Sequence, residues 1–372
     1  MILKNAQLFD ENFHLIRADL SVKDDTITEI AAEIPGDGLD FSGCVILPGF
    51  IDVHIHGCAG ADFGDAKAES LKIMSDYLAS CGVTSFCPAS MTVPESQLTP
   101  SFQAVADYRG KESGAYIHGI NMEGPFISHK RKGAQPGEHI RKPDLAEFDR
   151  LRSICKVVMV DVAPEAEGAF AFAEAASKIC TVSAAHTAAP YELTVESFRH
   201  GFSHTTHLLN GMEGIMPRDP GVATAVLDDN SVTAELICDG RHIYPALLRI
   251  AFRLLDEDRT IVVSDAMKAA GLGDGEYTLG GQTVYVKDKR ATLADGTFAA
   301  SVSNIFEEFR NIVSYGIPLK QAVKSCTINP ARVIGAEKSV GSLAKGKKAD
   351  LLVLDGSMTE IRAVFIQGRR HS

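Results

Sequence analysis

Eight short apolar runs, separated by segments of helical pattern, constrain the fold of this chain more than any other feature. Strands that alternate with helices predict a parallel sheet, and eight such units predict a closed barrel rather than an open sheet. The expected fold class is therefore α/β, with a TIM-type (β/α)8 barrel. The runs are Phe50–Ile55, Val83–Pro88, Ala115–Met122, Val157–Val162, Thr181–Ala185, Phe202–Thr206, Val232–Cys238 and Thr260–Ser264.

The two ends of the chain have a different pattern, in which short strand-like runs are broken by Asp, Asn, Gly and Pro. Because chain ends usually lie close together, we expect residues 1–47 and 345–372 to form one small β-sandwich domain. Residues 48–344 then form the barrel. Within it, the glycine-rich stretch 271–296 predicts a β-hairpin insert, which either joins the small domain or caps the barrel.

Length and charge set wider limits. A barrel takes roughly 250 residues, so a chain of 372 residues, 45% of them hydrophobic, has enough left for a second unit. The formal net charge of −11 argues against a nucleic-acid binder, which would present a basic face. Eight cysteines without C-x-x-C spacing predict free thiols in a reducing compartment. With no signal-peptide pattern and no membrane-length apolar run, we expect a cytoplasmic protein.

Polar residues that can bind metal follow the apolar runs. The first run leads into His54-Ile-His56, and residues two apart on a strand face the same side. Active sites of such barrels lie at the carboxyl ends of the strands. We therefore expect these side chains to meet. The later runs lead into Glu123, His186, His204 with His207, Asp239 with His242, and Asp265.

Taken singly, each of these residues also has a structural explanation: a hydrogen-bonded histidine, a turn residue for Glu123, or a helix N-cap for Asp265. Together they form another pattern. Two imidazoles, a carboxylate and an open water position are the ligands of a catalytic zinc site, and a further carboxylate can move protons. His204 and His207 are three residues apart and face opposite sides of a strand. We expect His207 to be the ligand, because a loop begins directly after it.

The motifs resemble a known family. Pro48–Gly57 is similar to the opening motif of the amidohydrolase superfamily, and the resemblance to N-acetylglucosamine-6-phosphate deacetylases covers nearly the whole chain. His-x-His alone indicates only the superfamily, whereas Glu-Gly-Pro-Phe and Thr-His-Leu-x-Asn are more specific. The family motifs are Met122–Phe126, Ser183–Thr187, Thr206–Met212, Asp239–His242, Ser264–Ala266 and Gly341–Leu354.

The resemblance implies a metal site and an acid–base residue. Glu123, His186 and His207 would hold the main metal ion, zinc or iron, and Asp265 would be the general base and acid. His54 and His56 vary within the family, and members that keep both can bind a second ion bridged by the glutamate. One or two ions are therefore expected. Other amidohydrolases use a carbamylated lysine on the fourth strand, but the run Val157–Val162 contains no lysine.

The resemblance also implies a substrate site. Arg218 would grip a 6-phosphate, since a guanidinium binds phosphate through two hydrogen bonds; alternatively, it is a solvated loop arginine. Asn210 and Gly211 would offer backbone N–H groups nearby. His242 would contact the sugar or the scissile acetamide carbonyl.

Two departures from the family pattern concern this substrate site. Many relatives have Lys-Gly-x-His where this chain has Lys132-Gly-Ala-Gln135, so Gln135 or the nearby His139 would replace a substrate-binding histidine. The same loop can reach a neighbouring subunit in the family, which predicts a homodimer. The second departure, Phe298-Ala-Ala-Ser-Val-Ser, predicts a slightly reshaped sugar pocket.

The implied reaction is metal-dependent deacetylation of N-acetylglucosamine 6-phosphate to glucosamine 6-phosphate and acetate in amino-sugar catabolism. A deacetylase for N-acetylgalactosamine 6-phosphate is an alternative that one sequence does not distinguish. A ring-opening cyclic amidohydrolase fits less well, because the fourth-strand lysine is missing and Arg218 is present. A non-catalytic scaffold would be expected to have lost metal ligands, and every one is present here.

Overall fold

Strands of a parallel sheet occupy the predicted apolar runs in a computed structural model that describes residues 1–371. Strand β9 lies between β6 and β10 in one sheet, and β11 to β16 follow one another in a second. Two parallel bridges connect the sheets: Ala89, just after β9, pairs with Asn121 of β11, and Ile55 of β6 pairs with Ala266, beyond β16. The strands are β6 (Phe50–Ile55), β9 (Val83–Pro88), β10 (Tyr116–Ile117), β11 (Ile120–Phe126), β12 (Val157–Val162), β13 (Thr181–Ala184), β14 (Phe202–Thr205), β15 (Thr233–Leu236) and β16 (Thr260–Val262).

The third run differs from its prediction. Instead of one strand over Ala115–Met122, the chain forms β10 on β9 and then β11 on β12. The break falls at Gly119, whose φ is 158° and where a side chain would collide with the carbonyl of Lys156. Strand β11 then continues to Phe126, so Glu123 lies inside a buried strand rather than after it.

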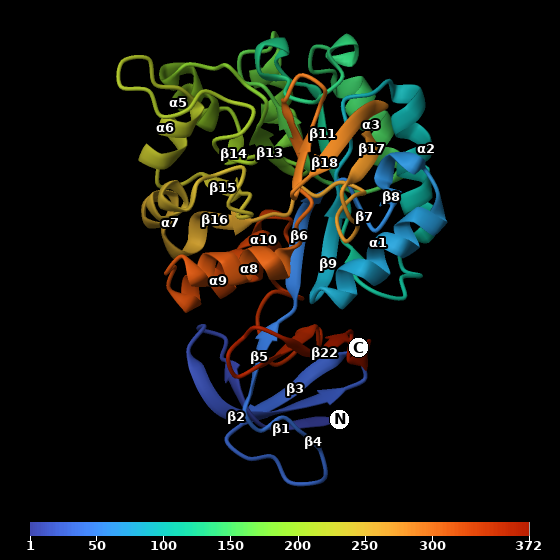
Figure 1. Cartoon of the computed structure of the whole chain (residues 1–372), viewed down its shortest axis with the longest axis vertical. Helices are drawn as coiled ribbons and strands as arrows, with labels where there is room; N and C mark the ends of the chain where they lie inside the picture. The colour runs from blue at the N-terminus through green and yellow to red at the C-terminus, as the bar shows by residue number, and fades with distance from the viewer. Residues whose placement is uncertain (372) are drawn as a thin grey trace.

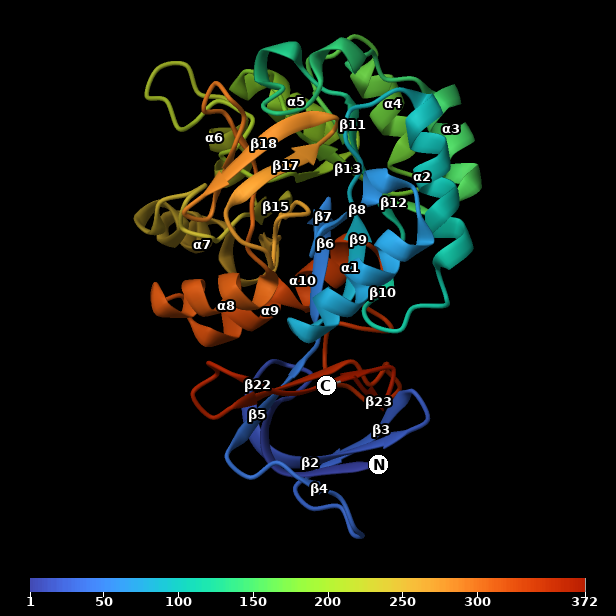
Figure 2. The same ribbon diagram turned by 45° about the vertical axis from the view of Figure 1, so that its right-hand side comes forward.

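Helices surround these strands (Figures 1 and 2). In α7 the buried residues Leu248, Ala251, Phe252 and Leu255 repeat at helical spacing and face the strands, as expected of an amphipathic helix. No helix within residues 1–371 is both long and apolar enough to cross a membrane. The helices are α1 (Ala68–Ser80), α2 (Glu95–Tyr108), α3 (Leu145–Ile154), α4 (Ala169–Ala176), α5 (Tyr191–Arg199), α6 (Val222–Asp228), α7 (Pro245–Arg259), α8 (Ile305–Ser314), α9 (Leu319–Cys326) and α10 (Ile328–Val333).

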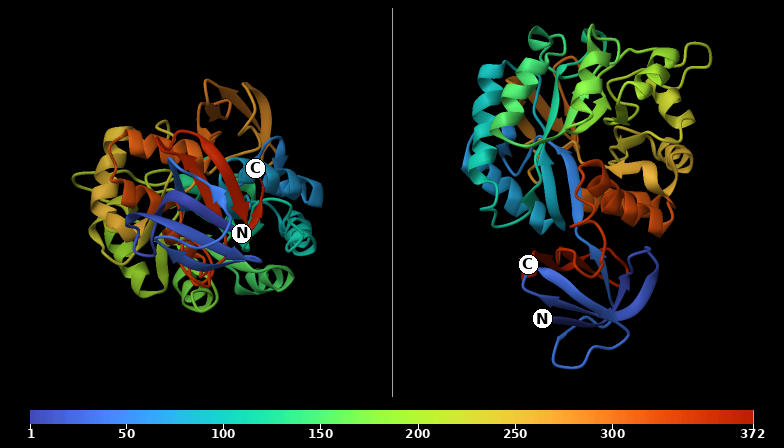
Figure 3. Two further views of the ribbon diagram at one scale, coloured as in Figure 1. Left: turned by 90° about the horizontal axis from the view of Figure 1, so that it is seen from below. Right: turned by 180° about the vertical axis from the view of Figure 1, so that it is seen from behind.

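Both ends of the chain contribute to one further sheet, in the order β23-β22-β21-β5-β1-β2-β3 with β4 beside β1. It is a single sheet that curves around its own core, which includes Leu20, Ile46 and Phe365 (Figures 2 and 3). Strand β5 leads through Gly49 directly into β6. The strands are β1 (Ile2–Phe9), β2 (Leu15–Lys23), β3 (Thr26–Ala31), β4 (Leu39–Asp40), β5 (Cys44–Pro48), β21 (Leu351–Asp355), β22 (Ile361–Ile366) and β23 (Arg369–Arg370).

The glycine-rich stretch forms more than a hairpin. Strands β17 (Gly275–Leu279) and β18 (Gln282–Lys287) pair antiparallel, and β19 (Arg290–Thr292) and β20 (Phe298–Ala300) extend them to a four-stranded sheet. Leu279 and Val284 of this sheet pack on Met91 and Met267, which follow β9 and β16. The insert therefore lies at the carboxyl ends of the parallel strands, on the side away from the terminal sheet (Figure 2).

Helix α8 packs on β6, the strand that leads into His54 and His56. Phe309 of α8 and Phe50 of β6 are both fully buried, with ring centroids 5.2 Å apart. We expect Phe309→Ala to lower the free energy of unfolding by about 3–5 kcal/mol, because truncation leaves a cavity. Urea unfolding followed by circular dichroism measures this loss. Phe306→Ala, on the half-buried side of α8, is the control, and an equal loss in both variants would contradict this packing.

Candidate metal and active site

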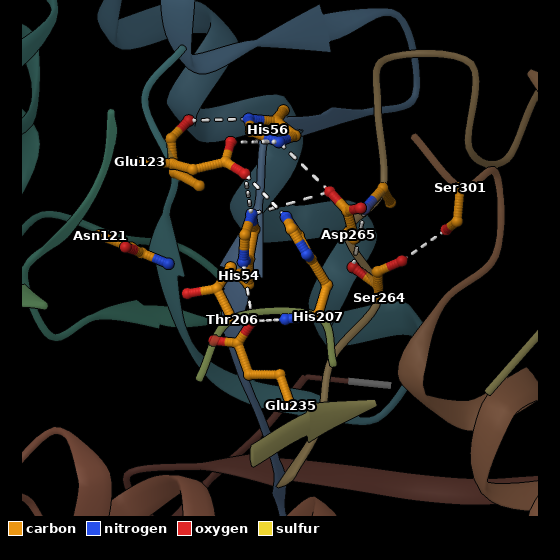
Figure 4. Close-up of polar contacts among 12 residues, drawn as sticks. His54, His56, Asn121, Glu123, Thr206, His207, Glu235, Ser264, Asp265 and Ser301 are labelled. Carbon is orange, nitrogen blue, oxygen red and sulfur yellow. Dashed lines mark hydrogen bonds and ion pairs between the residues drawn. The ribbon is translucent and has the colours of Figure 1, made fainter. Parts of the chain in front are cut away.

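Four histidines and two carboxylates meet where the parallel strands end. Figure 4 labels His54, His56 and His207 around Glu123 and Asp265. Glu123 is at the centre and is only 1% exposed. Its Oε1 lies 3.0 Å from Nε2 of His186, 3.2 Å from Nε2 of His207 and 3.6 Å from Nε2 of His54. Its Oε2 lies 3.3 Å from Nε2 of His56. Glu123 therefore belongs to two groups able to hold a cation, one with His186 and His207 and one with His54 and His56.

Nδ1, the ring nitrogen that faces away from Glu123, has a hydrogen-bond partner in each of the four histidines. A carbonyl oxygen only accepts hydrogen bonds, so a ring bonded to one must carry its proton on Nδ1. The neutral ring then presents the Nε2 lone pair, which is what a metal ion requires. Three rings are held in this way: His56 by the carbonyl of Ala89 (3.2 Å), His186 by Arg131 (3.0 Å) and His207 by Asn210 (3.1 Å). This donor set fits a divalent metal.

The charges in the cluster depend on one another. Burial would raise the pKa of Glu123, but the imidazoles of His54, His186 and His207 outweigh burial and hold that pKa well below its ordinary value. Burial would likewise lower the pKa of His54, yet the carboxylates of Glu235 and Glu123 hold it well above its ordinary value. The buried Nε2 of His54 has no hydrogen-bond partner among residues 1–371. A metal cation at this place would satisfy carboxylate and imidazoles together.

Three site residues have a strained backbone. The φ angles of His186, His207 and Asp265 are 43°, 31° and 45°, in the left-handed region that non-glycine residues rarely adopt. Each such residue costs on the order of 1–3 kcal/mol and is typical of functional sites. All three come two or three residues after a strand ends. The turn they make sends their side chains into the shared centre instead of along the strand.

Asp265 faces the pair His54 and His56. Its Oδ1 lies 3.2 Å from Nε2 of His56 and 3.7 Å from Nε2 of His54. Backbone bonds fix it on both sides, because its N–H donates to the carbonyl of His54 and its carbonyl accepts from the N–H of Ser301. Burial would raise the pKa of Asp265, but the facing imidazoles outweigh burial and keep it below its ordinary value. Asp265 is therefore an ionised carboxylate able to accept a proton.

His242 follows strand β15 and is held by Asp239. Its Nδ1 is 2.8 Å from Oδ2 of Asp239, whose Oδ1 accepts the N–H groups of Arg241 and His242. The His242 ring packs against Phe298 of β20, with centroids 4.9 Å apart. The insert sheet thus touches a residue of the site directly.

Six of the residues described above line a cavity of about 190 Å³: His56, Glu123, His186, His207, His242 and Asp265. Among the described residues, its lining contains no lysine or arginine, so an anionic ligand would need a positive charge from elsewhere. The lining residues are His56, Met91, Glu123, Gly133, Ala134, Gln135, His186, His207, Asn210, Gly211, His242, Asp265, Thr297, Phe298, Ala299 and Ala300.

Gln135 lines the cavity but is held by protein at both ends. Its Nε2 donates to Oε2 of Glu123, and its Oε1 accepts from the N–H of Thr92, each at 2.7 Å. His139 is partly exposed and not among the lining residues. Of the two predicted backbone donors, the N–H of Asn210 is bonded to His207, whereas the N–H of Gly211 has no backbone partner within residues 1–371.

Arg218 and His204 lie away from the cavity. Arg218 is exposed, on the loop between β14 and α6, and does not line the cavity. His204 is fully buried, and its ring nitrogens contact Thr233 (2.7 Å) and Glu235 (3.3 Å).

Sequence reasoning missed Glu235, which lies directly beneath the cluster. It is fully buried within β15 and contacts the ring of His54 and the backbone of His207. The available signal was a lone charged residue inside the apolar run Val232–Cys238. It also missed Met91 as a cavity wall, because the sequence left open whether the insert lies against the barrel. The segment beginning at Phe298, which the sequence linked to the pocket, does line the cavity through Phe298, Ala299 and Ala300.

Known proteins resemble this chain along its whole length. The model of the amidohydrolase family matches residues 45–370. The N-acetylglucosamine-6-phosphate deacetylase of Lysinibacillus sphaericus is 34% identical over 95% of this chain and 94% of its own. The N-acetylgalactosamine-6-phosphate deacetylase of Escherichia coli O157:H7 is 32% identical over 99% and 98%. A Mycobacterium smegmatis N-acetyl-D-glucosamine-6-phosphate deacetylase mutant, solved in complex with N-acetyl-D-glucosamine-6-phosphate, superposes with a TM-score of 0.94 at 30% identity, covering 100% and 99%.

Asp52, two residues before His54, makes stability depend on pH. It is fully buried and bonds Ser264, the residue before Asp265. Burial raises the pKa of Asp52 to about 7. The folded state therefore binds a proton at Asp52 more tightly than the unfolded state does. The contribution of this proton to the free energy of unfolding is complete below about pH 4. It falls by about 1.4 kcal/mol per pH unit and is lost as the pH rises through 7.

We expect Asp52→Asn, which stays neutral, to remove this dependence. Urea unfolding of both proteins between pH 4 and pH 8 gives the difference in unfolding free energy, which should move in favour of the variant as the pH rises. Parallel curves would show that Asp52 is ionised throughout.

Proposed function

The chain belongs to the amidohydrolase family, and we propose that it deacetylates N-acetylglucosamine 6-phosphate to glucosamine 6-phosphate and acetate in amino-sugar catabolism. The observation that carries this proposal is the Glu123-centred histidine cluster at the floor of a cavity. Relatives about one-third identical over nearly their whole length bear the deacetylase name.

We infer that residues 48–344 form a closed (β/α)8 barrel of the TIM type, and that residues 1–47 and 345–371 form a small β-domain; Ser372 lies outside the described residues. The bridges Ala89–Asn121 and Ile55–Ala266 support closure, because they join the segment after β9 to β11, and β6 to the segment after β16. The site residues at the carboxyl ends of the strands support it too, since barrel enzymes keep their active sites there.

Glu123, His186 and His207 would hold a divalent metal ion, zinc or iron, and His54 and His56 would hold a second with the same glutamate. Bound metal lowers the pKa of a coordinated water toward neutrality and polarises a carbonyl. The protein's part is to orient the rings: in the neutral form of His56, His186 and His207, the Nδ1 bonds fix the tautomer whose Nε2 carries the lone pair.

Asp265 is the residue we assign to proton transfer. Its ionised carboxylate can take a proton from the attacking water, and the same group can then return that proton to the departing sugar amine. A fixed backbone on both sides keeps the carboxylate in place during both transfers. General acid–base catalysis of this kind contributes about 10²–10⁴-fold to a rate.

His242 is placed to stabilise negative charge. Because Asp239 can balance a positive imidazolium, His242 can donate from Nε2 to the acetamide oxygen as charge develops there, or to a sugar hydroxyl. Gln135 would act on substrate only through the face it presents to the cavity, since both its amide atoms bond protein. His139 remains the second candidate of that loop.

We assign phosphate binding to Arg218, with the N–H of Gly211 and the Asn210 region as further contacts. The absence of any lysine or arginine from the described cavity lining supports a contribution from an outer loop. We also propose a homodimer, in which the exposed loop that carries Arg218 would lie between the subunits. We expect the enzyme to act in the cytoplasm, where sugar phosphates are retained.

Two other substrates follow from the same site. The Escherichia coli relative named for N-acetylgalactosamine 6-phosphate aligns over nearly the whole chain, which makes that epimer the second candidate. A cyclic-amide substrate is disfavoured, because β12 carries Asp161 and no lysine that could be carbamylated.

Acetate release tests the proposed reaction. The enzyme would be stripped of metal with a chelator, reloaded with zinc or iron, and given N-acetylglucosamine 6-phosphate, its galacto epimer or the unphosphorylated sugar. We expect metal-dependent turnover of the phosphorylated glucosamine derivative, and little of the sugar that lacks phosphate. If no sugar is turned over with metal restored, the substrate assignment is wrong.

Replacing the proton-transfer residue tests the mechanism. We expect Asp265→Asn to lower kcat by about 10²–10⁴-fold, because the amide cannot accept a proton. Asp37→Asn, in an exposed turn near the N-terminus, is the control and should keep full activity. The metal content of each protein is measured alongside. Full turnover in an Asp265→Asn enzyme that binds metal normally would remove this role.

A further inference from the structure

Glu235 touches candidate ligands of both metal groups. Its Oε2 lies 3.0 Å from Nδ1 of His54 and 3.1 Å from the backbone nitrogen of His207. Its Oε1 lies 3.3 Å from Nε2 of His204. In Figure 4, Glu235 lies on the side of His54 opposite Glu123, so the His54 ring stands between two carboxylates.

His54 is held differently from the other candidate ligands. His56, His186 and His207 each bond a neutral backbone carbonyl through Nδ1, whereas His54 bonds a carboxylate. A carboxylate behind a metal-binding imidazole fixes the ring's orientation and tautomer and makes its free nitrogen a stronger donor. The strongest such support in this cluster therefore lies behind His54.

A purely structural role does not account for this carboxylate. Burying a charge costs several kcal/mol, and apolar residues of similar size usually stabilise a protein core as well or better. Strand β15 is otherwise apolar beside Glu235, with Ala234 and Leu236 fully buried. The residue is placed under His54, where a negative charge helps to hold a cation above it.

We propose that Glu235 is a positioning residue that makes His54, His56 and Glu123 an effective second metal subsite. It orients the His54 ring so that Nε2 faces the subsite. Its contact with the backbone nitrogen of His207 fixes the position of this subsite relative to the first. The inference rests on the metal chemistry of the proposed function and is independent of which sugar is the substrate.

Metal titration of the full-length protein tests this role without any substrate. The metal-free protein is titrated with Zn²⁺ by calorimetry, and bound zinc is counted by elemental analysis. We expect two sites in the unchanged protein. In Glu235→Gln, which cannot carry the charge, we expect the second ion to bind about 10–100-fold more weakly and the first to change little.

Companion variants separate positioning from folding. His54→Asn should lose the same ion, and Thr233→Val, which removes the hydroxyl contacts to His204 and to the carbonyl of Ser203, should keep both. Circular dichroism of the metal-free proteins checks the fold, and Glu235→Asp, which keeps the charge but withdraws it, replaces Glu235→Gln if that variant does not fold. Two sites of unchanged affinity in the Glu235 variant, or a single site in the unchanged protein, would overturn the proposal. Failure of the acetate assay would leave it standing.

Discussion

The site depends on one buried carboxylate surrounded by imidazoles. Glu123 lies within a strand, almost without solvent, and only the facing histidines make its charge tolerable. The histidines are fixed in turn by hydrogen bonds on their outer nitrogens, so neither partner can rearrange alone. A divalent cation entering this array would contact the carboxylate and the imidazoles together. The position of the strands, the geometry of the site and its ability to bind metal all depend on this contact between Glu123 and the histidines.

The surrounding structure must offset the conformational energy of the strained backbone in the site. Left-handed backbone at His186, His207 and Asp265 is unfavourable, and the strands must be rigid enough to hold it. Parallel strands with helices packed outside supply that rigidity, while Phe298–Ala300 of the insert sheet form part of the cavity wall. The curved sheet at the chain ends has its own core, and β5 connects it directly to the strand that leads to His54.

Much of this arrangement could be predicted from the sequence. Strands occur at all the predicted runs. The predicted residues His54, His56, Glu123, His186, His207 and Asp265 converge, because parallel strands end at one edge, whereas His204 lies away from the cavity. The break at Gly119 could not be predicted, since it depends on contact with a distant strand. Glu235 was missed because its role appears only when β15 lies beneath His54. The role of Arg218 stays a prediction, since its side chain is exposed and outside the cavity lining.

The proposed chemistry requires metal to bind between Glu123 and the histidines around it. Anomalous X-ray diffraction from zinc-loaded crystals, recorded on both sides of the zinc absorption edge, locates the metal independently of any assay. We expect a strong anomalous peak within bonding distance of Glu123, His186 and His207, and a second beside His54 and His56. Zinc bound only elsewhere, with the cluster unchanged and metal-free, would contradict metal binding at this site.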